Sequence, residues 1–129
     1  MSKQYVDIAV NGVELPFEVD TGSPVVLLGE QYFRRYFADE WLSSSSKLYG
    51  ASGEAVPVVG SFMATLGFGK KSGHVPVVVQ AQERQIGLLG VPGLDVLFPG
   101  WRRSFQSGGE VNLLNKLPCS LKFNLSKIR

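Results

Sequence analysis

The chain has 129 residues, of which 44% are apolar and 19% are charged, and its formal net charge is +2. This composition predicts one globular domain with a modest core. The basic residues are scattered, which argues against a nucleic-acid surface, and no apolar run approaches the ~18 residues of a membrane span. One cysteine, Cys119, excludes an internal disulfide, and with one histidine, His74, it is too little for a zinc site. No metal or cofactor is therefore expected.

The N-terminal part of the chain predicts strands. Tyr5–Val10 alternates between apolar and polar residues, Asn11-Gly12 is a strong hairpin signal, and Val13–Val19 alternates back. After a short segment that begins at Asp20, the apolar run Val25–Leu28 predicts a buried strand. One carboxylate thus stands between two buried-strand patterns, where an unpaired charge is costly.

One helix is predicted over Glu30–Leu42, because aromatic residues recur there at spacings of three and four. These residues are Tyr32, Phe33, Tyr36, Phe37 and Trp41. We expect this aromatic series to pack in the core rather than to form a stacking platform for a ligand.

The later part of the chain also has a pattern typical of strands. Over the whole chain, 15 Gly and 7 Pro residues separate short apolar runs. Residues 47–59 predict two strands around a tip of small residues. The next segments predict a strand, a polar turn, a strand, an apolar strand ending in glycine and a short helix, in the order Met63–Phe68, 69–73, Val75–Gln80, Ile86–Gly90 and Gly93–Phe98. From Arg102 the periodicity fades into a linker-like stretch, and the alternating run Ser120–Leu125 is a candidate terminal strand.

Few catalytic chemistries fit this inventory. A nucleophilic Ser or Cys enzyme would have to use His74, which follows a polar turn and is expected to be an exposed loop histidine. The stretch around Lys70 and Lys71 misses the spacing of a phosphate-binding loop. Carboxylates remain, and Asp20 stands out. From the residues alone it is either a turn or cap aspartate or a carboxylate held for catalysis.

The segment Asp20-Thr21-Gly22-Ser23 between apolar strands, with the later Leu88-Leu89-Gly90, resembles the catalytic loop and the late strand of retropepsins. These are the half-length, homodimeric aspartic proteases of retroviruses and long-terminal-repeat retrotransposons. The resemblance covers roughly Tyr5 to Trp101, and the run 89–95 is more similar to the gypsy-like retrotransposon proteases.

The resemblance implies a mostly β fold for residues 1–104. This would be a single-domain, retropepsin-like closed β-barrel, the acid protease fold, with a flap hairpin and one or two short helices. A twofold homodimer would complete it. Residues 105–129 would form a linker-like tail that includes the candidate C-terminal dimerisation strand.

Roles for the loop residues follow from the same resemblance. Asp20 would be the catalytic carboxylate, paired with Asp20 of the partner subunit so that the two share one proton. The hydroxyl of Thr21 would cross the dimer axis and lock the two loops. Gly22 would offer its carbonyl to the substrate, and Ser23 would hydrogen-bond the outer carboxylate oxygen.

The segment 48–60 resembles the flap that closes over an extended peptide substrate. Its tip is Tyr49, Gly50, Ala51, Ser52 and Gly53. Leu88 would line a side-chain pocket that prefers apolar residues. The implied function is that of an aspartic endopeptidase that processes a retroelement polyprotein, in the cytoplasm or within virus-like particles. Neither nucleic acid nor a membrane is expected to bind this domain.

The sequence also departs from the retroviral pattern. Pro24 and Val91 stand where many retroviral proteases place an acidic residue and an arginine that pair with each other. Both charges are missing together, so neither is left buried alone. Two alternatives stay open: a weakly active or inactive module of this fold that dimerises or binds peptides, and a small β-barrel binding domain with an incidental Asp-Thr-Gly turn.

Overall fold

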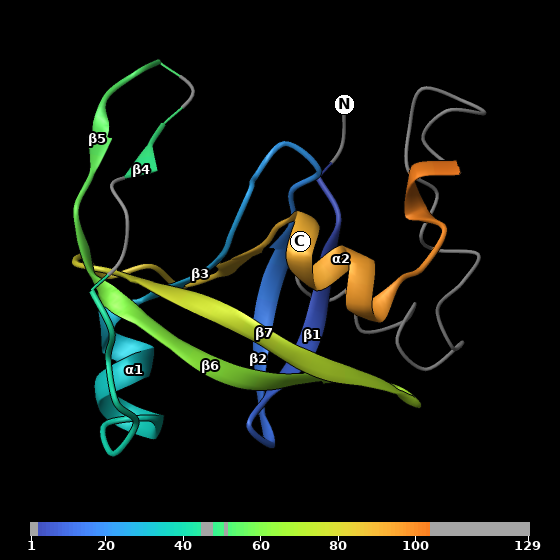
Figure 1. Ribbon diagram of the computed structural model, residues 1–129, viewed down its shortest axis with the longest axis horizontal. Coiled ribbons are helices and arrows are strands. Elements are labelled where there is room, and N and C mark those ends of the chain that lie inside the picture. The colour runs from blue at the N-terminus through green and yellow to red at the C-terminus, as the bar shows by residue number, and fades with distance from the viewer. Residues whose placement is uncertain (1–2, 45–47, 51, 104–129) are drawn as a thin grey trace.

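The alternating runs of the sequence form strands, joined by tight turns and two short helices (Figure 1). The computed structural model describes residues 3–44, 48–50 and 52–103. Its elements are β1 (Tyr5–Val10), β2 (Val13–Val19), β3 (Val26–Gly29), α1 (Glu30–Tyr36), β4 (Leu48–Tyr49), β5 (Ala55–Val56), β6 (Val58–Phe68), β7 (Lys71–Gln80), β8 (Gly87–Leu89) and α2 (Val91–Leu97). The tail predicted for residues 105–129 lies outside the described part.

Six of the strands close into a barrel in the order β1-β2-β8-β3-β7-β6, and β6 pairs back onto β1. The hairpins β1–β2 and β6–β7 are antiparallel. Strand β8 inserts between β2 and β3, parallel to β2 and antiparallel to β3. A segment from the end of the domain therefore lies beside the loop that follows β2. The predicted mostly β, closed-barrel fold class is confirmed.

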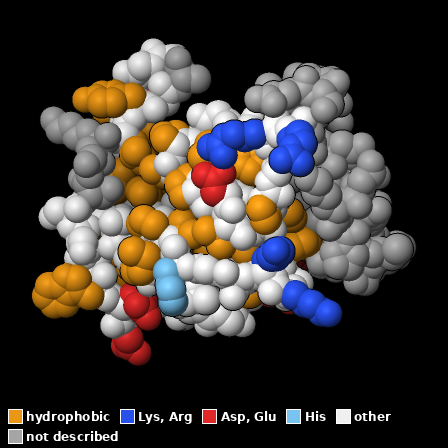
Figure 2. All heavy atoms as spheres, turned by 45° about the vertical axis from the view of Figure 1, so that its right-hand side comes forward, with side chains coloured by type: hydrophobic (Ala, Val, Ile, Leu, Met, Phe, Trp, Pro, Cys, Tyr) orange, Lys and Arg blue, Asp and Glu red, His pale blue; other side chains and the backbone are white. Residues whose placement is uncertain are grey.

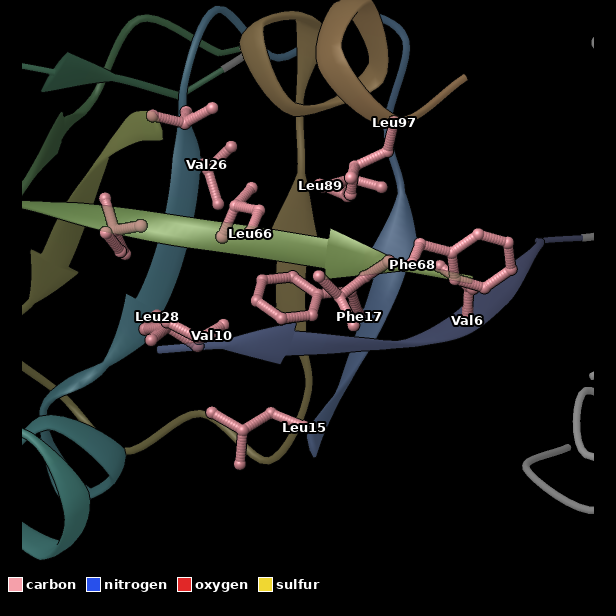
Figure 3. Close-up of a cluster of buried hydrophobic side chains, with 14 of the residues drawn as sticks. Val6, Val10, Leu15, Phe17, Val26, Leu28, Leu66, Phe68, Leu89 and Leu97 are labelled. Carbon is pink, nitrogen blue, oxygen red and sulfur yellow. The ribbon is translucent and has the colours of Figure 1, made fainter. Parts of the chain in front are cut away.

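The core lies inside the barrel, where the inward side chains of neighbouring strands meet (Figure 3). Val6, Ile8 and Val10 alternate inward along β1, and Phe17 is fully buried on β2. Leu89 brings the late strand into the same cluster. On β2 and β8 the side chains that alternate with these core residues, such as Glu18 and Leu88, point away from the core and are only partly buried.

Helix α1 is shorter than predicted. It ends at Tyr36 instead of continuing to residue 42, and the N–H of Phe37 donates the closing hydrogen bond to the carbonyl of Phe33 at 2.8 Å. Two residues explain the early stop. Ser43 pairs with Ser61 of β6 through N–H to O bonds of 2.8 and 2.9 Å, so the chain must leave the helix to reach the barrel.

The aromatic series of this segment divides between core and surface. Phe33 and Phe37 are buried and pack against Phe62, with ring centroids 5.5 and 5.4 Å apart. Trp41 lies beyond the helix and is 85% exposed. The core prediction is right for the two phenylalanines. It is wrong for Tyr36, which lies on the helix but is 42% exposed, and for Trp41, where the helical spacing no longer applies.

The β6–β7 hairpin is longer than predicted. The ladder runs without a break from Ser61 to the pair Phe68↔Lys71, so residues 71–73 belong to β7 rather than to a turn. The turn is Gly69-Lys70, and Gly69 has the positive φ of +60° that such a tight connection requires.

Two surface features complete the description. Within the ranges that the structure covers, neither helix has the length and apolarity to cross a membrane. On the face seen in Figure 2, apolar side chains gather across the middle, and the basic side chains lie at separate places around them.

Candidate active site

The loop that begins at Asp20 continues directly from β2. The N–H of Asp20 donates to the carbonyl of Leu89 at 3.0 Å, which extends the β2–β8 ladder by one residue. The chain then turns back, and the N–H of Gly22 donates to Oδ1 of Asp20 at 3.0 Å, while the N–H of Ser23 donates to its carbonyl at 3.2 Å. The carboxylate is half-buried and is oriented by its own loop.

A glycine at the end of β8 holds this loop in place from behind. The N–H of Val91 donates to the carbonyl of Ser23 at 2.8 Å. A Cβ at Gly90 would lie 2.5 Å from that carbonyl oxygen and would also overlap the carbonyl of Val25. Only glycine allows the start of α2 to pack this closely against the loop. We did not identify Gly90 as a support residue from the sequence, although the glycine that ends an apolar run is the signal for it.

The two hydroxyl residues of the loop are placed differently. Ser23 is buried, and its Oγ donates to the carbonyl of Val25 at 2.8 Å and accepts from the N–H of Val25 at 3.3 Å. It therefore braces the loop backbone in this chain, where a bond to the Asp20 carboxylate was expected. Thr21 is half-buried at the turn. Its predicted contact across a dimer axis involves a second chain and stays a prediction.

The predicted flap hairpin is a separate two-stranded sheet of β4 and β5, with Tyr49 opposite Ala55. Its tip is closed by hydrogen bonds from the N–H of Gly50 to the carbonyl of Glu54 at 2.8 Å and from the N–H of Gly53 to the carbonyl of Gly50 at 2.9 Å. Figure 1 shows the hairpin projecting on the same side of the barrel as the loop after β2.

Three of the described tip residues are open to solvent. The Tyr49 side chain is 63% exposed, and Ser52 and Gly53 are exposed as well. Gly53 has φ +85°, a conformation that favours glycine. Ala51 lies outside the described residues. Among the residues that the structure describes, none buries the Tyr49 side chain, and this exposure suits an element that would close over a ligand.

The predicted pocket residue Leu88 lies on β8, half-buried, on the face that points away from the core. Its Cα partners are Glu18 on β2 and Leu27 on β3. The register therefore brings Asp20 and Leu88 to the same face of the sheet. That Leu88 lines a substrate pocket stays a prediction.

Other chemistry-bearing side chains have structural partners. Asp95 accepts hydrogen bonds from Nε1 of Trp101 at 2.9 Å and from Arg102 at 2.6 Å, and these bonds lower the pKa of its carboxyl. His74 is exposed on β7, rather than in a loop, with Nδ1 3.1 Å from the hydroxyl of Thr65. Among the described residues, no group of three or more His, Cys, Asp or Glu side chains is placed to hold a metal ion.

Comparison with known proteins agrees with this geometry. The family model of aspartyl proteases matches residues 6–92, which is two thirds of the chain and extends from within β1 to the start of α2. The chain belongs to this family of aspartyl proteases and is an aspartic-type peptidase. No curated protein matched the sequence.

Solved structures show the same fold at low sequence identity. The EIAV protease complexed with the inhibitor HBY-793 is 17% identical, with a TM-score of 0.59 over 84% of this chain and 89% of that chain. A retropepsin-like aspartic protease from Rickettsia conorii is 18% identical, with a TM-score of 0.53 over 72% and 70%. The retroviral protease-like domain of Ddi1 from Leishmania major is 14% identical, with a TM-score of 0.57 over 74% and 77%. The fold is therefore that of a retropepsin.

Proposed function

We propose that this chain is the subunit of a homodimeric endopeptidase in which Asp20 of each subunit supplies one of two catalytic carboxylates. One observation carries the proposal: the chain has a single Asp-Thr-Gly loop, held in place by β8 and Gly90 behind it. Peptide hydrolysis by carboxylates needs one group that takes a proton from water and another that protonates the carbonyl. A twofold axis beside the loop would provide the second group.

The pairing would also set the protonation of the site. Two carboxylates about 3 Å apart do not both ionise readily, so the pair retains one proton over a range of pH. The ionised member then activates the water, and the protonated member donates to the substrate carbonyl. The two pKa values belong to the pair rather than to either aspartate, and activity should follow a bell-shaped profile with an acidic optimum.

The other loop and flap residues receive supporting roles in this proposal. Thr21 would bind the partner's loop, and the carbonyl of Gly22 would accept a hydrogen bond from the substrate backbone. The hairpin of β4 and β5 would close over an extended peptide and pair with its backbone, as β-strand addition does elsewhere. The half-buried carboxylate and the exposed hairpin on the same side of the barrel are consistent with this arrangement.

The substrate that we propose is a retroelement polyprotein, of gypsy-like type, in which this domain is one segment. The chain would then act in the cytoplasm or within virus-like particles. The half-length fold supports this, because one loop per chain makes activity depend on the encounter of two polyprotein molecules.

Replacement of the proposed catalytic residue tests the function directly. Asp20→Asn keeps the size and the hydrogen-bonding oxygen of the side chain but removes its charge, so we expect normal folding and a loss of cleavage of roughly a thousandfold or more. The measurement is cleavage of a peptide library over a mildly acidic buffer series, with a statine-type transition-state mimic as inhibitor. Equal cleavage by wild type and variant would show that Asp20 is not catalytic.

A further inference from the structure

A second carboxylate lies on the same face of the barrel wall as Asp20. Side chains two positions apart on a strand point to the same side, and the bond from Asp20 to Leu89 keeps the chain extended to that point. The Glu18 side chain therefore points to the same side of the strand as the Asp20 side chain, and the two Cα atoms are about 6.6 Å apart along the strand. Phe17, which immediately precedes Glu18 and so points to the opposite side of the strand, is fully buried in the core.

Apolar side chains extend from Glu18 across the neighbouring strands. The register places Leu88 beside Glu18, and Leu27 beside Leu88. The next residues along these strands, Leu89 on β8 and Leu28 on β3, belong to the barrel core. The row formed by Glu18, Leu88 and Leu27 therefore faces away from the core. Leu27 is itself buried, so the partly exposed surface beside Asp20 joins the apolar side chain of Leu88 to the negative charge of Glu18.

The Glu18 carboxylate already binds a cation, although weakly. Nζ of Lys3 lies 3.8 Å from its Oε1, and the side chains are 66% and 22% exposed. An ion pair with so exposed a lysine contributes little to stability. Another cation that approaches from the solvent side could replace Lys3 at little cost, while the glutamate itself stays fixed on its strand.

We propose that Glu18 selects a lysine or arginine side chain of the substrate within two residues of the scissile bond. The aliphatic stem of such a residue would pack on Leu88, and its charged end would bind the carboxylate. This inference rests on the proposed function, because the peptide must cross this face with its scissile bond at Asp20. The proposed site would prefer a basic side chain with an aliphatic stem, whereas Leu88 alone implies a purely apolar side chain.

The chain offers a matched control on the same strand. Glu14 has the same parity as Glu18, but it lies four residues earlier, near the β1–β2 turn, and is exposed. At about 3.3 Å per residue it is roughly 20 Å from Asp20 along the strand. Removal of its charge should alter the net charge of the protein equally without touching the substrate.

The test uses peptides that share one cleaved sequence and carry Lys, Arg, Gln, Leu or Glu at each position within two residues of the scissile bond. At one position we expect kcat/KM about fivefold higher for Lys than for Gln in the wild type. Glu18→Gln should bring this ratio close to one, and Glu14→Gln should preserve it. Lys3→Gln should increase the ratio, and Glu18→Lys should shift the preference to the Glu peptide.

The possible failures are separable. If Glu18→Gln keeps the wild-type ratio while cleavage still requires Asp20, Glu18 does not select substrates and the proposed function stands. If Glu18→Gln folds normally but cleaves no peptide, the residue acts in the chemistry and the selection proposal is wrong. If no peptide is cleaved in an Asp20-dependent manner by any variant, the proposed function and this inference both fall.

Discussion

At the scale of single residues, the position of Asp20 depends on a glycine seventy positions away. The start of α2 approaches the loop so closely that no side chain fits at Gly90. Its neighbour Val91 donates the hydrogen bond that fixes the carbonyl of Ser23. The carboxylate is therefore oriented by a contact between distant parts of the chain as well as by its own turn.

We expect Gly90→Ala to lower both stability and activity. The added methyl group would overlap two backbone carbonyls, which cannot rotate away as a side chain can, and such overpacking costs about 1 to 3 kcal/mol or more. Thermal unfolding and peptide cleavage measure the two effects. The control is Gly67→Ala, whose new Cβ would meet Ala9 and Lys71 only at 3.7 and 3.9 Å. Equal melting temperatures for the two variants would contradict the close approach.

Two other aspartates predict opposite effects of pH on stability. Burial, assisted by Glu14, raises the pKa of Asp7 above its ordinary 3.8, so its ionised form is disfavoured in the folded state. Hydrogen bonds from Trp101 and then Arg102 lower the pKa of Asp95, so its ionised form is favoured by folding. Asp7 therefore reduces stability as pH rises through its native pKa, and Asp95 loses its contribution as pH falls through its own.

At neutral pH we expect Asp7→Asn to raise the melting temperature and Asp95→Asn to lower it. Both differences should shrink in acid, where the wild-type carboxyls become protonated and differ little from the amides. Melting curves over a series of acidic to neutral buffers provide the measurement. A shift of the same sign for both variants at neutral pH would refute these assignments.

At the scale of elements, the β4–β5 hairpin, which is the candidate flap, can be compared with the β6–β7 hairpin. Each ends in a turn with a glycine at positive φ, +85° for Gly53 and +60° for Gly69, and a Cβ at either site would meet no atom of the described residues within 4 Å. The first hairpin projects from the barrel with an exposed Tyr49, whereas the second is part of the barrel wall.

Alanine at these two glycines should therefore affect different properties. Each substitution strains the turn by about 1 to 2 kcal/mol. We expect Gly53→Ala to raise KM about fivefold with little change in melting temperature, because β4 and β5 add little to the core. Gly69→Ala should lower the melting temperature and leave KM nearly unchanged. If Gly53→Ala behaves like Gly69→Ala, the hairpin does not act as a flap.

The elements also show where sequence reasoning was sufficient. The β1–β2 hairpin was predicted correctly because its signals are local: alternation along both strands, and an Asn11-Gly12 turn whose φ angles are 47° and 85°. The end of α1 was not predicted correctly, because it depends on the pairing between Ser43 and Ser61, a contact that no local pattern reveals.

The candidate site also has features that the sequence predicts and features that depend on the fold. The loop Asp20–Ser23 was recognisable from its own residues and flanking strands, and the structure places it at the end of β2 as expected. The support from Gly90 and the position of Glu18 beside Leu88 depend on the insertion of β8 between β2 and β3. That register joins residues about seventy positions apart, so spacing along the chain could not supply it.

At the scale of the whole molecule, the fold and the family define an aspartic peptidase, but one chain contains one Asp-Thr-Gly loop. The central claim of the proposed function is that the active site is shared between two identical chains. In that case a dimer with one Asp20→Asn subunit lacks half of the carboxylate pair and should be inactive. A site contained within each chain would be unaffected by its partner.

Unfolding equal amounts of wild-type and Asp20→Asn chains together, refolding them and measuring cleavage tests this claim most directly. Random pairing would leave about one quarter of the dimers with two intact chains, so activity should fall to about one quarter of that of wild type refolded at the same total concentration. A parallel mixture with Glu14→Gln should keep full activity. Activity of about one half in the Asp20→Asn mixture would mean that each chain carries a complete site.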